Sequence, residues 1–303
     1  MKAVKVTCLG VAVVGSILGA GAAQAVDAAA SPTLGRIKAS GTIAIGHRTS
    51  SIPFSYYDSS QKVIGYSQDI CDKVIAEVRK QTAVANLQVR MIPVTSQNRI
   101  SLVQNGTVDL ECGVTTNLKS RQQQVAFSTT FFVAGTRLLV KKGSPVQDFH
   151  DLSGRAVVTN AGTTSERILR KLNDEKKANI TIQSAKDYGE SFLILQSGRV
   201  AAFMMDDVLL SGVRTMSPNP TEWTVVGMPQ SFEAYGFMMR KDDPEFKKLV
   251  DGVITGLMKS GEIKVIYDKW FNKPIPPKNI NFEFPMSAEV RKAYEQPGDD
   301  AFE

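Results

Sequence analysis

The sequence ECGVTTNLKSRQQQVAFSTTFF, residues 111–132, decides the predicted fold. A buried strand is expected over Val108–Cys112, ending at the glycine that follows it. Two hydroxyl residues, Thr115 and Thr116, come next, and Arg121 lies five residues further on. An arginine offers a fixed fork of donors that matches a carboxylate, and nearby hydroxyls complete such a site. Because the chain then becomes apolar and extended again, the stretch predicts a carboxylate site in a cleft between two lobes. A surface loop with a solvated arginine is the alternative.

Alternating strand-like and helix-like segments predict an α/β protein with two doubly wound lobes. The chain has 303 residues and 43% hydrophobic content, and single cores stop growing at about 250–300 residues. The expected strands are Thr42–Gly46, Leu87–Ile92, Val108–Cys112, Thr136–Val140, Arg155–Thr159, Arg199–Met205 and Tyr235–Met239. The expected helices are Leu34–Ser40, one capped by Ser67, Tyr188–Gln196, Pro244–Lys259 and Glu262–Phe271. We expect residues 26–134 and 237–303 to form lobe 1 and residues 135–236 to form lobe 2, with two crossing strands between them.

The N-terminus has the pattern of a cleaved secretory signal over residues 1–25. Lys2 and Lys5 precede an apolar run, Leu9–Ala20, and Ala-Gln-Ala follows as a small-residue cleavage site. A membrane anchor is the competing interpretation, but the run is short and rich in Gly and Ala. We therefore expect an exported, periplasmic protein with a disordered leader at 26–33. Removal of the two lysines lowers the formal net charge from +6 to +4, and no basic run with interleaved aromatics suggests nucleic acid.

Two cysteines remain after the predicted cleavage, Cys71 and Cys112. Export permits a disulfide between them, and two buried thiols are the alternative. A metal site is not expected, because His47 and His150 show no ligand spacing. His47 could act as a general base, but a single histidine is more often packed or capping.

Polar side chains follow several of the predicted strands. Arg48 comes after the first strand, Ser96 and Arg99 after the second, and Asp206 after an apolar strand of the second lobe. Thr164 opens a helix after a glycine, where backbone N–H groups bind anions; simple N-capping explains only one of its hydroxyl residues. In open α/β sheets, ligands bind at the carboxyl ends of the strands, where these side chains lie. An acid among so many anion-binding groups predicts a bound ammonium, as in an amino acid.

The order of these motifs resembles the periplasmic glutamate/aspartate-binding proteins of ABC importers. The resemblance rests on GHRTSSIPFSYYD, IGYSQD, VTSQNRI, GTVDLECGVTTN, GTRLLVKKG, GTTSE, AFMMDD, EAYGFMMRKDDPEFKKL and DKWFNKPIPPKN, which cover nearly all of the chain beyond the predicted signal. It implies the type II binding-protein fold, two α/β lobes that close around one amino acid for an inner-membrane ABC permease. A monomer without a cofactor is expected.

The resemblance also implies residue roles. The positions that match the ligand α-carboxylate site are Arg121, Thr116 and Thr164. Asp206 matches the acid that binds the α-ammonium. The positions that match the distal carboxylate site are Arg48, Ser96 and Arg99.

Two positions depart from the pattern of the family. Val114 replaces a serine, although its backbone carbonyl could still accept from the ammonium, and Tyr188 replaces a histidine near the distal carboxylate. A phenol ionises only near about pH 10, so Tyr188 predicts a ligand affinity that is nearly flat from pH 6 to 8. Both departures leave the preference between glutamate and aspartate open.

The leading hypothesis is therefore a solute-binding protein for L-glutamate or L-aspartate, not an enzyme. The alternative is a periplasmic dehydratase acting on prephenate or arogenate, which would need a general acid near the leaving hydroxyl. A sensory role, in which the loaded protein docks on a membrane receptor, is a third possibility.

Overall fold

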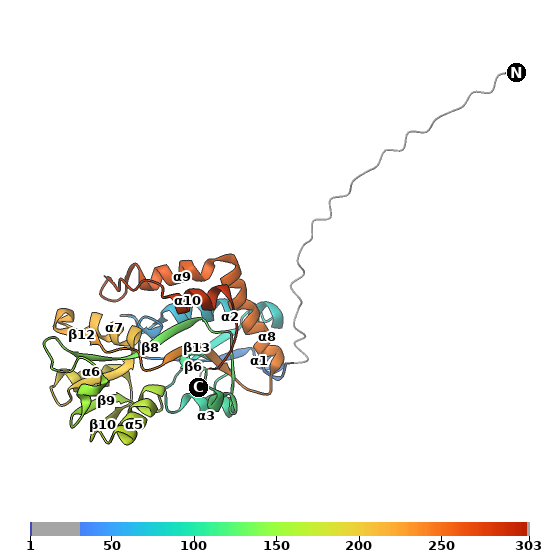
Figure 1. Ribbon diagram of the computed structural model, residues 1–303. Coiled ribbons are helices and arrows are strands. Elements are labelled where there is room, and N and C mark those ends of the chain that lie inside the picture. Colours follow the sequence, from blue (N-terminus) through green and yellow to red (C-terminus); the bar gives the residue numbers. More distant parts are fainter. Residues whose placement is uncertain (2–30, 302–303) are drawn as a thin grey trace.

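The computed structural model describes Met1 and residues 31–301 (Figure 1). The predicted signal at 1–25 lies outside these residues apart from Met1, and so does the leader up to residue 30. The last part of that predicted leader is ordered, because Ser31 caps helix α1, Pro32–Ser40, through its side chain. Within residues 31–301 no helix is both long and apolar enough to cross a membrane.

One large sheet runs through the molecule in the order β10-β9-β11-β8-β13-β6-β1-β5. Strands β1, β5 and β6 are parallel in one half, and β9, β10 and β11 are parallel in the other. The bounds are β1 Thr42–His47, β5 Gln88–Pro93, β6 Leu110–Thr116, β8 Phe132–Lys141, β9 Ala156–Asn160, β10 Thr181–Ala185, β11 Ala202–Asp206 and β13 Phe232–Met239. Two short strands pair with its central strands: β7 Ala126–Phe127 pairs with β13, and β12 Trp223–Val226 pairs with β8.

The two halves are joined by the antiparallel strands β8 and β13. Phe132–Gly135 of β8 pair with Phe232–Tyr235 of β13, and the continuation of β8 pairs with β11. The continuation of β13 pairs with β6 in the other half. Each of these strands therefore belongs to both lobes, as predicted, and Figure 1 shows them in the centre of the molecule.

Helices cover both faces of the sheet (Figure 1). Besides α1 they are α2 Tyr66–Thr82, α3 Arg99–Gln104, α4 Lys119–Gln122, α5 Thr164–Lys176, α6 Tyr188–Gln196, α7 Asp207–Thr215, α8 Pro244–Ser260, α9 Glu262–Phe271 and α10 Ala288–Glu295. Short 3-10 turns lie at Phe149–Leu152 and Pro220–Glu222. Small two- and three-residue strands complete the chain, namely β2 Ser50–Ser51, β3 Ser55–Tyr57, β4 Val63–Ile64, β14 Pro274–Ile275 and β15 Ile280–Asn281. Strand β10 and helices α7 and α10 were not among the predicted elements.

Two local predictions at β6 and α2 were wrong. Strand β6 does not end at Gly113 but continues to Thr116, because β13 offers a second run of backbone partners there. Ser67 does not cap α2, which begins one residue earlier after Gly65. Its hydroxyl donates instead to the Gly113 carbonyl at 2.9 Å, so it links the helix to the strand.

Aromatic side chains fix the lobe 1 end of the crossing strands. The Phe132 ring at the start of β8 stacks on Phe271 at a centroid distance of 5.3 Å and on Tyr235 at 5.8 Å. Phe54 meets Phe132 edge-on at 4.8 Å. Because buried aromatic pairs are among the larger packing contributions, this end of β8 is firmly held in lobe 1.

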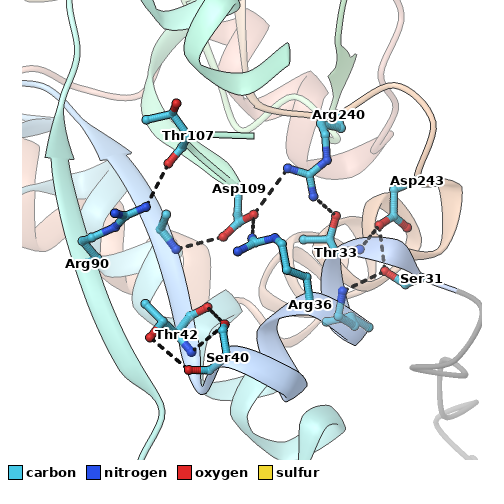
Figure 2. A network of polar contacts seen from close by, with 12 residues as sticks. Ser31, Thr33, Arg36, Ser40, Thr42, Arg90, Thr107, Asp109, Arg240 and Asp243 are labelled. Carbon is cyan, nitrogen blue, oxygen red and sulfur yellow. Dashed lines mark hydrogen bonds and ion pairs between the residues drawn. The ribbon is translucent and has the colours of Figure 1, made fainter. Parts of the chain in front are cut away.

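At the N-terminal end of β6, a polar network surrounds Asp109 (Figure 2). Its fully buried carboxylate accepts from the Ala44 backbone N–H at 2.9 Å and from the Arg36 and Arg240 guanidiniums. Arg240 also donates to Thr33 at 2.6 Å. The network ties α1, β1, the start of β6 and the end of β13 together, on the side of lobe 1 away from the carboxyl ends of its parallel strands.

Cys71 on α2 and Cys112 on β6 form the disulfide that the sequence favoured, with their Cα atoms 6.0 Å apart. It joins the helix to the central strand and closes a loop with a sequence separation of 41 residues. In the chain-entropy account, such a loop contributes up to about 4 kcal/mol by restricting the unfolded chain.

We expect the double variant Cys71→Ser, Cys112→Ser to lower the free energy of unfolding by up to about 4 kcal/mol. Urea unfolding of the variant and of the oxidised protein measures the difference. Equal midpoints and equal slopes would show that the bridge contributes nothing.

Candidate functional site

The predicted site residues meet where the parallel strands of both lobes end. Lobe 1 contributes Arg48 after β1, Ser96 and Arg99 after β5, and the end of β6. Lobe 2 contributes the start of α5, the start of α6 and the end of β11. All nine predicted residues are buried. Carboxyl ends of parallel strands form the ligand-binding edge of open α/β sheets.

Arg48 and Arg99, the predicted distal group, are both buried in this cleft. The Arg48 Nη1 atom donates to Ser96 Oγ at 3.0 Å, and its Cζ atom lies 5.0 Å from the centre of the Tyr188 ring. The Arg99 Nη1 atom donates to the Val114 carbonyl at 3.2 Å. Each guanidinium thus donates to a neutral oxygen, and Tyr188 reaches this group from the other lobe.

The two departures from the family pattern have different consequences in the structure. The Val114 carbonyl, which could accept from an ammonium, accepts from Arg99 in this structure. Tyr188 presents its ring face to Arg48, a cation–π contact.

Arg121 closes the cleft near the proximal end. Its Nη1 atom donates to the Thr116 carbonyl at 2.9 Å and its Nη2 atom to the Gly162 carbonyl of lobe 2 at 3.2 Å. Burial, together with the nearby charge of Arg99, lowers the pKa of Arg121 to about 9. The guanidinium remains charged at neutral pH and bridges the two lobes.

Asp206 lies at the end of β11 and is held by the crossing strands. It accepts from the Tyr235 hydroxyl, and from Thr136 Oγ1 at 3.4 Å. Burial and the neighbouring Glu233 raise the pKa of Asp206 to about 8 from its usual value of 3.8. An adjacent ammonium would favour the ionised form again, so binding of an ammonium should release a proton.

Glu233 on β13 belongs to the same cluster and was missed by the sequence analysis. Its carboxylate accepts from Thr116 Oγ1 at 2.6 Å and from the Ser231 hydroxyl, and it lies 3.3 Å from Thr136 Oγ1, whose single proton Glu233 and Asp206 share. The hydroxyl proton of Thr116 is therefore directed toward Glu233. The only indication in the sequence was an acid placed within the crossing strand, two residues before Tyr235.

At the start of α5, one threonine caps the helix and the next is a candidate ligand-binding residue. Thr163 is the N-cap, because its side chain accepts from the Glu166 backbone N–H at 3.1 Å. Thr164 is the first helical residue and makes no side-chain hydrogen bond within the described chain. Thr164 and the buried Ser165, whose Oγ atom also has no partner within the described chain, are therefore the hydroxyl residues at this helix start that do not serve as its cap.

His47 packs in the core of lobe 1 and does not extend the polar site. Its Nδ1 atom lies 3.0 Å from the Arg48 carbonyl, and its ring meets Tyr57 edge-on at 5.3 Å. Burial lowers its pKa. No group of three or more histidine, cysteine, aspartate or glutamate side chains in residues 31–301 could hold a metal ion.

The two lobes touch around the cleft through two glycines of lobe 2. A Cβ on Gly162 would lie 2.8 Å from the Gln97 Cα atom, and a Cβ on Gly212 would collide with the Ile52 carbonyl. A hollow of about 450 Å³ remains at the mouth, lined among others by Arg121, Gly162 and Thr164. The lobes therefore meet closely enough that these two positions tolerate no side chain.

This architecture defines a class of protein. Two α/β lobes joined by two strands, with buried charged groups of both signs between them, are typical of proteins that close around a small charged solute.

Comparisons with known proteins give the family. Residues 43–273 match the model of the bacterial extracellular solute-binding proteins, family 3, and the chain belongs to this family. It is 55% identical to the glutamate/aspartate import solute-binding protein of Escherichia coli K12, over 96% of this chain and 97% of that protein. It is 56% identical to the L-glutamate/L-aspartate-binding protein of Pseudomonas aeruginosa, over 89% and 90%. A solved ancestral arginine-binding protein bound to arginine matches with a TM-score of 0.69 and 28% identity, over 76% and 98%.

The expectation drawn from Tyr188 concerned ligand affinity. The raised pKa of Asp206 adds a second pH dependence, that of the stability of the ligand-free protein. In the ligand-free protein, stability from this group is fully present below about pH 4 and is lost as pH rises toward about 8, because the folded state retains a proton that the unfolded chain releases. Asp206→Asn should therefore gain thermal stability relative to the parent protein more at pH 8 than at pH 5. Ligand-free melting at both pH values tests this, and the same difference at both would contradict it.

Gly212 gives a test of lobe closure that leaves the ligand contacts intact. Gly212→Ala should raise helix stability by about 1 kcal/mol, yet weaken binding of the solute at least roughly tenfold, since the closed arrangement is disfavoured. Gly256→Ala is the matched control, because a Cβ there meets nothing within 4 Å. Calorimetry of both variants measures the affinity. Unchanged affinity in Gly212→Ala would show that this contact does not limit closure.

Proposed function

We propose that this solute-binding protein captures L-glutamate or L-aspartate between its lobes and delivers it to an inner-membrane ABC permease. The observation that carries the proposal is the state of its three buried arginines. Arg48, Arg99 and Arg121 donate to neutral oxygens only, and none forms an ion pair within the described chain. A buried charge without a counter-charge is costly. A ligand with two carboxylates would supply the missing charge at both ends of the cleft.

The geometry supports one orientation of the ligand. The α-carboxylate would lie between Arg121 of lobe 1 and Thr164 at the start of α5, with Thr116 alongside. The α-ammonium would approach Asp206, whose proton it would displace. The distal carboxylate would bind between Arg48 and Arg99, beside Ser96.

The names of the relatives support the same ligands. Both relatives at 55–56% identity carry glutamate and aspartate in their names, and one is an import protein. They are binding proteins, which argues against the dehydratase alternative. Val114 and Tyr188 both contact the distal arginines, so we infer that these two positions set the preference between the two acids.

The division into lobes belongs to the same proposal. We assign residues 26–134 and 237–303 to lobe 1 and 135–236 to lobe 2, since β8 changes partner from β13 to β11 after Gly135. Export through the cleaved signal at 1–25, a monomeric state and docking on the permease complete it. A membrane receptor, the third possibility, would also have to bind the surface of the closed, loaded protein.

A ligand panel tests the function. Ligand-stripped protein should bind glutamate and aspartate and bind glutamine and asparagine much more weakly, since stranding a buried charge typically costs roughly 2–5 kcal/mol. Calorimetric titration of the four amino acids measures this. Prephenate serves as the control for the dehydratase alternative, and its absorbance should not change. Glutamine binding as tightly as glutamate would overturn the assignment of Arg48 and Arg99.

A further inference from the structure

Glu111 lies beneath the distal group and is not among the predicted site residues. It is the second residue of β6 and is 0% exposed. Its Oε2 atom accepts from Thr115 Oγ1 at 2.8 Å, but its Oε1 atom has no hydrogen-bond partner within the described chain. A buried carboxylate oxygen without a donor is costly, so its position calls for a physical reason.

Gly113 shows where the unpartnered oxygen lies. A Cβ at this position would collide with Glu111 Oε1 and would lie 3.2 Å from the Arg48 Cγ atom. Gly113 does not have a positive φ, so glycine is required for space and not for backbone conformation. The Glu111 carboxylate therefore lies over Gly113, and the Arg48 side chain lies on the same side of that residue.

The same carboxylate acts on Arg99. The Arg99 Nε atom also has no hydrogen-bond partner, so the two groups interact through space and not through a hydrogen bond. Burial lowers the pKa of Arg99, and the negative charge of Glu111 is the first influence that opposes it. In a buried region of low effective dielectric, the Coulomb energy between such neighbours is larger at a given distance than in water.

The formal charges of the distal group then add up simply. Arg48 and Arg99 contribute two positive charges and Glu111 contributes one negative charge, which leaves one positive charge for the ligand to neutralise. We propose that Glu111 is a specificity-determining residue, which limits the distal group of the ligand to a single negative charge. The proposal rests on the proposed function and adds that amino acids with a dianionic distal group, such as phosphate monoesters, are excluded by charge.

A purely structural counter-ion would have a different effect. If Glu111 only held β6 and the arginines in place, its loss would weaken all ligands alike. If it sets the charge capacity of the subsite, its loss changes the ratio between two ligands of the same shape and different charge. That ratio is insensitive to general loss of packing and to the protonation of Asp206, because both ligands share the same α-amino and α-carboxylate groups.

L-serine O-sulfate and O-phospho-L-serine are such a pair. The two have tetrahedral head groups of similar size, and at pH 8 the sulfate ester carries one negative charge while the phosphate ester, whose second pKa is about 6, carries nearly two. Calorimetry at pH 8 on the parent protein, Glu111→Gln and Thr115→Val measures both affinities. Thr115→Val is the matched control, because it removes the hydrogen bond to Glu111 and keeps the charge.

The parent protein should bind the sulfate ester at least roughly tenfold more tightly than the phosphate ester. Glu111→Gln should shift this ratio toward the phosphate ester by roughly tenfold or more, and Thr115→Val should leave it unchanged. An unchanged ratio in Glu111→Gln, or equal affinities in the parent protein, would overturn the proposal; the second result needs no folded variant. Failure of the parent protein to bind glutamate and aspartate would instead refute the proposed function.

Discussion

The burial of three guanidinium groups between the lobes is the constraint on which the rest of the structure depends. Arg48, Arg99 and Arg121 are nearly inaccessible to water and donate only to hydroxyl and carbonyl oxygens. Desolvation of a charged group costs several kcal/mol even after relaxation. A solute with complementary charges offsets this cost. The same electrostatic requirement therefore governs how tightly the solute binds, which solutes bind and whether the lobes close.

The fold joins its two lobes through only two long strands, β8 and β13. In lobe 1, the Asp109 network and the Cys71–Cys112 bridge hold the sheet and its helices together on the side away from the cleft (Figure 2). The change of partners along β8 and β13 is the natural place for a hinge, since few backbone bonds need to alter there. Arg121 and Tyr188 each contact the opposite lobe, so two of the groups that we propose to recognise the solute also hold the closed arrangement.

Sequence reasoning predicted the parts of this site that depend on position along the chain. Arg48, Ser96, Arg99 and Asp206 were found because polar residues directly follow apolar strands, and helices α6 and α9 were predicted with their observed ends. What it missed depends on contacts between distant segments. Strand β6 extends past Gly113 because β13, more than 100 residues later, pairs with it, and Glu233 lies 117 residues from its partner Thr116.

The structure of the protein with bound L-aspartate tests the central claim most directly. The account predicts that the distal carboxylate lies within hydrogen-bond distance of both Arg48 and Arg99, that the α-carboxylate contacts Arg121, and that the ammonium contacts Asp206. A reversed ligand, with its ammonium among the arginines or its distal carboxylate away from Arg48 and Arg99, would contradict it.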